Sequence, residues 1–155
     1  MLDDLYTKQV LRAAAMISRT GRLDAPQASA SRVSPVCGSK ITVDLDMADG
    51  VITDYAQDIH ACALGQSAAS IVANTIVGQS PESVAEAAST VREMLLADGS
   101  PPDGDWADFG ILMNVKNHKA RHGAVLLALE ATLDAASQIT DTNYDDTATR
   151  LTRKA

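Results

Sequence analysis

Residues 37–70 read CGSKITVDLDMADGVITDYAQDIHACALGQSAAS, and this stretch decides the fold. Apolar and polar side chains alternate from residue 41 to residue 46, which is the period of a β-strand. Asp49-Gly50 is a turn signal, and residues 51–58 have the composition of a returning strand. The pattern therefore predicts a β-hairpin.

The two cysteines of the chain, Cys37 and Cys62, flank this hairpin. Because one enters it and the other leaves it, we expect both at the same end. The N-terminus Met1-Leu-Asp-Asp has neither the basic nor the apolar region of a secretory signal, and no stretch has the composition of a membrane span. We therefore expect a cytoplasmic protein with reduced thiols, where such a pair more often binds metal or reacts than forms a disulfide.

Helical patterns lie on both sides of the hairpin. Before it, residues 3–18 predict a helix that Gly21 ends, and residues 24–35 predict an extended arm or a short edge strand. After it, the sequence predicts an Ala-rich helix over residues 63–77, a second helix capped by Ser80-Pro81, a loop and short apolar piece over residues 99–115, and a long last helix.

These elements predict an α+β fold: a small antiparallel sheet of about three strands with helices packed on one face. We expect one domain over residues 1–139. Residues 140–155 are rich in Thr and Asp without a helical period, and we expect them to form a flexible C-terminal tail.

The composition limits both the core and the partners. Hydrophobic residues make up 46% of the chain but aromatic residues only 3%, and 26 residues are alanine, which favours closely packed helices. The formal net charge is −7. A nucleic-acid-binding protein needs a basic surface and rings for stacking, so we expect no nucleic-acid partner.

Cys37 and Cys62 are the first candidates for chemistry. Cys62 lies just before a predicted helix N-terminus, where free N–H groups favour an anion such as a thiolate. Gly38 allows the backbone to turn closely around a group bound to Cys37. The alternative is a pair of buried, inert cysteines, because free cysteine is among the most buried residue types.

A second candidate is the basic segment, residues 116–122, in which Lys116, His118, Lys119, Arg121 and His122 gather in an acidic protein. His118 and His122 can share one helical face, which suits a metal. The alternative is a solvated basic face. The sequence has no phosphate-binding loop, nucleophile elbow, zinc-protease motif or dinucleotide fingerprint, and we expect a protein that is not an enzyme.

Cys37-Gly-Ser39, the hairpin and Cys62-Ala-Leu-Gly-Gln-Ser-Ala-Ala-Ser70 together resemble the iron–sulfur cluster assembly scaffold family, which includes IscU, SufU and the N-terminal domain of NifU. The resemblance covers roughly Leu2 to Gln138. It implies a SufE/NifU-like fold and a site at one end where thiolates hold zinc or a nascent [2Fe–2S] cluster. It also implies sulfur delivery by a cysteine desulfurase and cluster transfer to acceptor proteins.

Two positions depart from the family pattern. The family Asp after Cys-Gly is Ser39, and the third family cysteine falls at Gly123 or Ala124. His122 stands beside that position. The resemblance therefore implies Cys37, Cys62 and His122 as ligands of iron, of a [2Fe–2S] cluster or of zinc, with Ser39, His118, water or a partner's thiolate as a fourth.

Two other functions fit the same residues. A SufE-like sulfur-relay protein would carry a persulfide on Cys62, with the basic segment stabilising the thiolate. A protein derived from a scaffold but without a cluster would act as a partner or regulator of the assembly machinery. The missing third cysteine motivates this last hypothesis.

Overall fold

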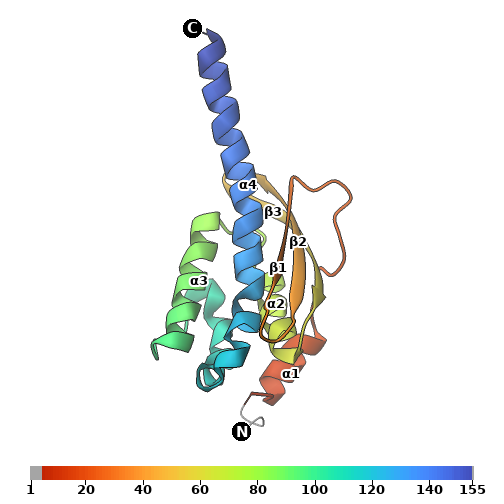
Figure 1. Cartoon of the computed structure of the whole chain (residues 1–155), viewed down its shortest axis with the longest axis vertical. Helices are drawn as coiled ribbons and strands as arrows, with labels where there is room; N and C mark the ends of the chain where they lie inside the picture. Colours follow the sequence, from red (N-terminus) through yellow and green to blue (C-terminus); the bar gives the residue numbers. More distant parts are fainter. Residues whose placement is uncertain (1–4, 155) are drawn as a thin grey trace.

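The chain folds into a three-stranded antiparallel sheet in the order β1–β2–β3, with helices packed against it (Figure 1). The structure is a computed structural model that describes the backbone of residues 5–154 and the side chains of residues 5–139. The strands are β1 (Ala28–Val33), β2 (Lys40–Ala48) and β3 (Val51–His60). The predicted α+β class is confirmed, and the predicted edge strand is β1.

β2 and β3 form the predicted hairpin. Their pairing runs from Lys40 opposite His60 to Ala48 opposite Val51. Asp49 and Gly50 make the turn with φ angles of 55° and 81°. Two-residue turns with both φ angles positive match the twist of the flanking strands, which is why Asp-Gly marks a hairpin so well.

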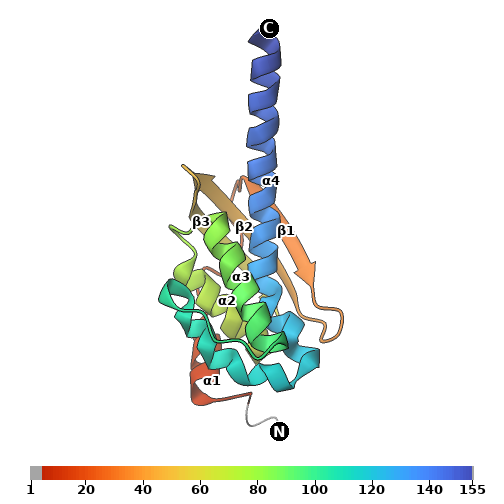
Figure 2. The same ribbon diagram turned by 90° about the vertical axis from the view of Figure 1, so that its left-hand side faces the viewer.

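The helices lie on one side of the sheet (Figure 2). The described part of the chain has α1 (Lys8–Ala15), α2 (Ala63–Thr75), α3 (Pro81–Leu96) and α4 (His122–Lys154), with 3-10 segments η2 (Gly104–Asn117) and η3 (Lys119–Arg121). The hydroxyl of Ser80 accepts a hydrogen bond from the N–H of Ser83 at 3.1 Å, as the sequence predicts for the start of α3.

Small side chains let α2 and α4 approach closely. A Cβ added to Gly65 would lie 3.6 Å from the carbonyl oxygen of Ala124. The buried core between helices and sheet consists mainly of alanine, leucine, valine and isoleucine, with Tyr55 and Phe109 as its largest fully buried side chains. The alanine-rich composition thus produces the close helix packing that was expected from it.

On the other face of the sheet, the segment before β1 covers the side chain of Asp44. This carboxylate is fully buried and accepts hydrogen bonds from Arg22 Nε at 2.6 Å, the N–H of Leu23 at 3.1 Å and Ser29 Oγ at 2.5 Å. Burial raises the pKa of Asp44, but the hydrogen bonds and the Arg22 charge outweigh it, and the pKa lies below its usual value. Asp44 thereby holds Arg22 and Leu23, in the segment that leads into β1, against β2.

The first helix is shorter than its apolar stripe predicts. α1 ends at Ala15, with Met16 as its C-cap, so Gly21 does not end it. The chain leaves the helix early because residues 19–21 run along β3, where the N–H of Gly21 donates to the carbonyl of Gln57 at 2.8 Å. Residues 3 and 4 of the predicted helix lie outside the described residues.

α4 continues to Lys154 and projects past the end of the sheet (Figure 1). The backbone after residue 140 is therefore helical rather than irregular, because a helix already formed in the core extends at the gain of one hydrogen bond per residue. The domain boundary at residue 139 and the flexibility of the C-terminal segment stay predictions, and Ala155 lies outside the described residues. In the described part of the chain, no helix combines the length and apolar character needed to cross a membrane.

Candidate functional site

Cys37 lies in the tight loop that joins β1 to β2. Two backbone hydrogen bonds close this loop: Ser34 N–H donates to the carbonyl of Ser39 at 2.8 Å, and Gly38 N–H donates to the carbonyl of Ser34 at 2.7 Å. Gly38 has a φ of 75°, which glycine adopts without strain. The loop leaves the Cys37 side chain partly exposed.

Cys62 lies at the same end of the hairpin. It is the N-cap residue of α2, and its side chain makes no capping hydrogen bond but packs partly buried against the core. Lys40 and His60 are the last paired residues of β2 and β3, so Cys37 precedes this pair closely and Cys62 follows it closely. The prediction that the hairpin brings both cysteines to one end is confirmed, and both thiols are free.

Two serine hydroxyls flank the sulfur of Cys37. Its Sγ lies 3.3 Å from Ser34 Oγ and 3.3 Å from Ser39 Oγ, and both serines are buried. A thiol can donate its single proton to one of them, whereas a thiolate accepts hydrogen bonds from both. Burial raises the pKa of Cys37, but these hydroxyls, the N–H of Ser39 and the charge of Arg121 outweigh it, so the pKa lies below its usual value.

The N-terminus of α4 contacts both cysteine-bearing segments. A Cβ added to Gly123 would lie 2.5 Å from Ser34 Oγ, whereas Ala124 packs against Gly65 in the first turn of α2. Gly123 is exposed and Ala124 is fully buried. Of the two positions that the sequence left open for the third family cysteine, Gly123 is therefore the one beside Ser34, whose hydroxyl lies 3.3 Å from the sulfur of Cys37.

His122 has a different environment from the predicted one. It is 8% exposed, and its ring Nε2 lies 2.9 Å from the carbonyl of Val115 and 3.2 Å from that of Lys116. Carbonyl oxygens only accept, so Nε2 carries the proton and is not free to bind a metal. Among residues 5–139, no three His, Cys, Asp or Glu side chains form a group able to hold a metal ion, so Cys37, Cys62 and His122 are not assembled as a metal site.

The basic segment is not one helical face. His118 separates η2 from η3 with φ −131° and ψ 79°, and α4 begins only at His122, so the predicted shared face of the two histidines is wrong. Lys116 Nζ forms an ion pair with Asp98 at 2.7 Å. Arg121 is the member of the segment whose charge reaches a cysteine, and that cysteine is Cys37.

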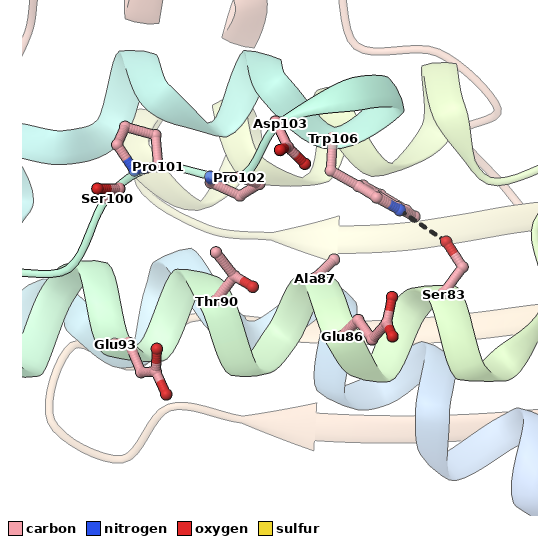
Figure 3. A pocket seen from close by; sticks show the side chains of 10 residues that line it. All are labelled: Ser83, Glu86, Ala87, Thr90, Glu93, Ser100, Pro101, Pro102, Asp103 and Trp106. Atoms are coloured by element: carbon pink, nitrogen blue, oxygen red, sulfur yellow. Dashed lines mark hydrogen bonds between the residues drawn. The ribbon is translucent and has the colours of Figure 1, made fainter.

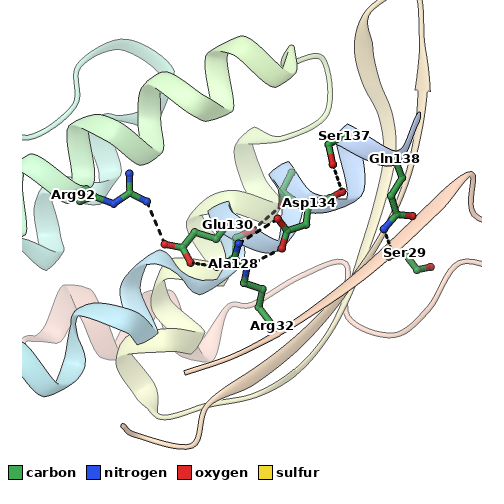
Figure 4. A network of polar contacts seen from close by, with 9 residues as sticks. Ser29, Arg32, Arg92, Ala128, Glu130, Asp134, Ser137 and Gln138 are labelled. Carbon is green, nitrogen blue, oxygen red and sulfur yellow. Dashed lines mark hydrogen bonds and ion pairs between the residues drawn. The ribbon is translucent and has the colours of Figure 1, made fainter. Parts of the chain in front are cut away.

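A polar network on α4 holds β1, the strand that leads into the Cys37 loop (Figure 4). Arg32 pairs with Asp134 at 2.6 Å and with Glu130 at 2.8 Å, and Glu130 also pairs with Arg92 of α3 at 3.3 Å. Farther along, Gln138 Nε2 donates to the carbonyl of Ser29 at 2.8 Å. The edge strand is therefore tied to α4, the helix that carries Gly123.

One hollow of the described surface lies away from these residues. It has a volume of about 380 Å³ between α3 and the loop before η2, and none of its lining residues is a predicted ligand (Figure 3). Glu86, Glu93 and Asp103 give it an acidic rim, and Trp106 Nε1 donates to Ser83 Oγ at 3.0 Å.

Comparison with known protein families identifies this arrangement. The family model of the NifU-like N terminal domain matches residues 5–123, which is more than half of the chain. The chain belongs to the NifU-like N-terminal domain family. The resemblance inferred from the two cysteine motifs and the hairpin is thereby confirmed.

Relatives of this NifU-like domain are similar to it in structure or in sequence. The N-terminal structure of a nitrogen-fixing NifU-like protein from Brucella abortus has 38% sequence identity and a TM-score of 0.88, and the match covers 90% of this chain and 97% of that chain. A Thermotoga maritima protein named iron–sulfur cluster assembly scaffold protein IscU is 24% identical over 135 residues, which are 87% of this chain and 94% of the relative.

A third relative is similar to this chain in fold only. It is a protein from Fervidobacterium islandicum AW-1 described as an iron–sulfur cluster assembly scaffold for the SUF system. Its TM-score is 0.78 at 16% identity, and the match covers 86% of this chain and 98% of that chain.

One residue of the site, Ser34, was not predicted from the sequence. It belongs to no motif, and its part in the site depends on a contact with Gly123, which is distant in sequence. Ser39, by contrast, was a candidate because it follows Cys37-Gly38, and the structure places its hydroxyl beside the sulfur.

Proposed function

We propose that this NifU-like domain is a scaffold that binds iron or a transient [2Fe–2S] cluster as its cargo and passes it to acceptor proteins. One observation carries the proposal: two free thiols lie at the same end of the hairpin, on segments that contact the N-terminus of α4. Family membership and the names of the relatives from Brucella abortus and Thermotoga maritima support it.

Cys37 and Cys62 are the ligands in this proposal. Thiolates suit iron and also zinc, so zinc is an alternative occupant. Two thiolates leave coordination positions open, to be filled by Ser39, His118, water or a partner's thiolate. His122 stays a predicted ligand: its Nε2 donates to the carbonyls of Val115 and Lys116, so Nδ1 is the ring nitrogen left to bind the cargo. An incompletely filled site suits a cargo that must be released, and the role is that of a carrier rather than an enzyme.

The surface around Cys37 favours protein partners. Val33 and Val36 are 55% and 74% exposed beside the loop, and exposed apolar side chains around a reactive group favour protein contact. Arg121 adds positive charge at this end of a protein whose net charge is −7. We infer that a cysteine desulfurase as sulfur donor and the cluster acceptors dock here.

A sulfur relay is the second candidate, and the geometry favours Cys37 over Cys62 as its nucleophile. Cys37 is partly exposed, and its thiolate accepts hydrogen bonds from Ser34 and Ser39. Its attack on the outer sulfur of a donor protein's persulfide forms the new S–S bond and releases the donor thiolate. The transfer needs no external oxidant or reductant, because one S–S bond replaces another.

Anaerobic reconstitution with ferrous iron and sulfide tests the scaffold function. The wild-type protein should retain iron and acid-labile sulfide with visible absorption, and Cys37→Ser and Cys62→Ser should each lose most of both. Met16→Ser removes an exposed sulfur at the end of α1 and is the matched control. Wild-type protein without iron or colour would reject the scaffold and favour the regulator hypothesis. In a separate incubation with a cysteine desulfurase and cysteine, which supplies a donor persulfide, a persulfide on Cys37 without retained metal would favour the relay.

A further inference from the structure

The hydroxyl of Ser34 occupies the space that a side chain at position 123 would need. A Cβ on residue 123 would lie 2.5 Å from Ser34 Oγ and 3.3 Å from Ser34 Cβ, and real Cβ atoms do not approach an oxygen so closely. The same Oγ lies 3.3 Å from Cys37 Sγ. Ser34 Oγ therefore lies between the sulfur of Cys37 and the position that the Cβ of a cysteine at residue 123 would occupy.

The loop does not need this hydroxyl for its own shape. The backbone N–H and carbonyl of Ser34 already close the loop through Ser39 and Gly38, and the side chain is turned toward the Cys37 sulfur instead. Ser34 is 5% exposed, and the exposed Gly123 beside it places no side chain over the hydroxyl. A ligand held by Cys37 can reach the oxygen from there.

We propose that the Ser34 hydroxyl is the third donor of the site, standing where a cysteine at position 123 would otherwise reach the cargo. The inference rests on the proposed scaffold function. Cys37, Cys62 and Ser34 then form a set of two sulfurs and one oxygen. A neutral hydroxyl is a harder and weaker donor than a thiolate, so this set holds a soft cargo less tightly than three thiolates do and favours its release.

The fold keeps Ser34 at this position. Ser34 directly follows β1, which Arg32 ties to Asp134 and Glu130 of α4. The same helix carries Gly123 at its N-terminal end. The ion pairs and the Ser34–Gly123 contact therefore join the same two elements, and the hydroxyl is positioned before any cargo arrives.

Anaerobic titration with Co²⁺, a spectroscopic substitute for zinc or ferrous iron, tests the proposal. The intensity of thiolate-to-cobalt charge transfer reports the number of thiolates, and the titration gives the affinity. Ser34→Ala should weaken Co²⁺ binding by tenfold or more, the scale of ligand-shell losses, without changing the charge transfer at saturation. Ser34→Cys should raise that intensity by about half, because three thiolates replace two. Ser31→Ala removes an exposed hydroxyl of β1 that bonds Thr42 and is the matched control.

Gly123→Ala supplies a second, independent test. Its Cβ displaces the Ser34 hydroxyl, so the variant should lose as much Co²⁺ affinity as Ser34→Ala. In the Ser34→Ala background the same substitution should add little further loss, because the hydroxyl is already gone. Additive losses would mean that the two residues act separately and would overturn the proposal.

The outcomes separate this inference from the proposed function. If Cys37→Ser and Cys62→Ser abolish Co²⁺ binding while Ser34→Ala and Gly123→Ala bind like the wild type, Ser34 is no donor and the scaffold function stands. If the cysteine variants bind Co²⁺ like the wild type, both proposals fail. A wild-type protein that binds no Co²⁺ overturns both as well, and Ser34→Cys without added charge transfer overturns the placement of Ser34.

Discussion

Replacing Asp44 with asparagine tests how the chain that leads into the Cys37 loop is held. The fully buried carboxylate uses both oxygens: Oδ2 accepts from Arg22 Nε and from the N–H of Leu23, and Oδ1 accepts from Arg22 Nη2 and Ser29 Oγ. An asparagine amide keeps one acceptor and replaces the other with a donor. Ser29 can rotate to accept from this donor, but Arg22 Nη2 loses its acceptor and the remaining hydrogen bonds lose the carboxylate charge. We expect a loss of about 2–3 kcal/mol of unfolding free energy.

Urea denaturation followed by the fluorescence of Trp106, the single and buried tryptophan, measures this loss. The matched control is Asp46→Asn on the same strand, where the carboxylate accepts from the N–H of Gln27 at 2.9 Å and an amide oxygen can replace it. We expect Asp46→Asn to cost less than about 1 kcal/mol, the value of a single neutral hydrogen bond.

The pH dependence gives a second readout. The pKa of Asp44 is depressed in the folded state, so its stabilisation is complete above the unfolded-state pKa of about 4 and is lost as the pH falls through the folded pKa. Asparagine does not titrate, so the difference between wild type and Asp44→Asn should shrink below about pH 4. A loss no larger than that of Asp46→Asn, or a difference that stays constant down to pH 3, would refute the reasoning.

Two further predictions concern the site itself. In the Cys62→Ser protein, iodoacetamide should alkylate Cys37 with a pH midpoint below the value of about 8.5 for a free cysteine. Adding Ser39→Ala should raise this midpoint, because the thiolate loses a hydrogen-bond donor. Equal midpoints in the two proteins would contradict the hydroxyl contacts. Gly65→Ala should lower the unfolding free energy by about 1–3 kcal/mol despite the better helix propensity of alanine, because its Cβ would lie 2.8 Å from that of Ala61. Gly110→Ala, whose nearest contact is 3.4 Å, is the control and should cost less.

The local features of the fold could be predicted from the sequence because neighbouring residues specify them. Asp49-Gly50 favours the positive φ angles of the hairpin turn, and Ser80-Pro81 supplies the cap of α3. The same logic placed Cys37 and Cys62 at one end of the hairpin. Each of these predictions depends on chemistry within a few residues of the feature.

The features that the sequence did not predict depend on contacts between residues that are distant in the chain. The buried pairing of Arg22 with Asp44 and the contact of Ser34 with Gly123 join residues that no pattern links. His118 and His122 have helical spacing, but the packing of η2 and η3 places a break between them. His122 stays a predicted ligand, but no pattern in the sequence indicates that its Nε2 ties the end of η2 to α4.

Cluster transfer tests the central claim most directly, namely that Cys37 and Cys62 together hold a cargo that the protein gives up. The measurement is the rate at which an apo-ferredoxin gains a [2Fe–2S] cluster from the reconstituted protein, followed by the electron paramagnetic resonance of the reduced acceptor. We expect transfer from the wild-type protein and its loss in the Cys37→Ser/Cys62→Ser double variant. Equal rates from the wild-type protein, the double variant and a mixture of iron and sulfide without protein would contradict it.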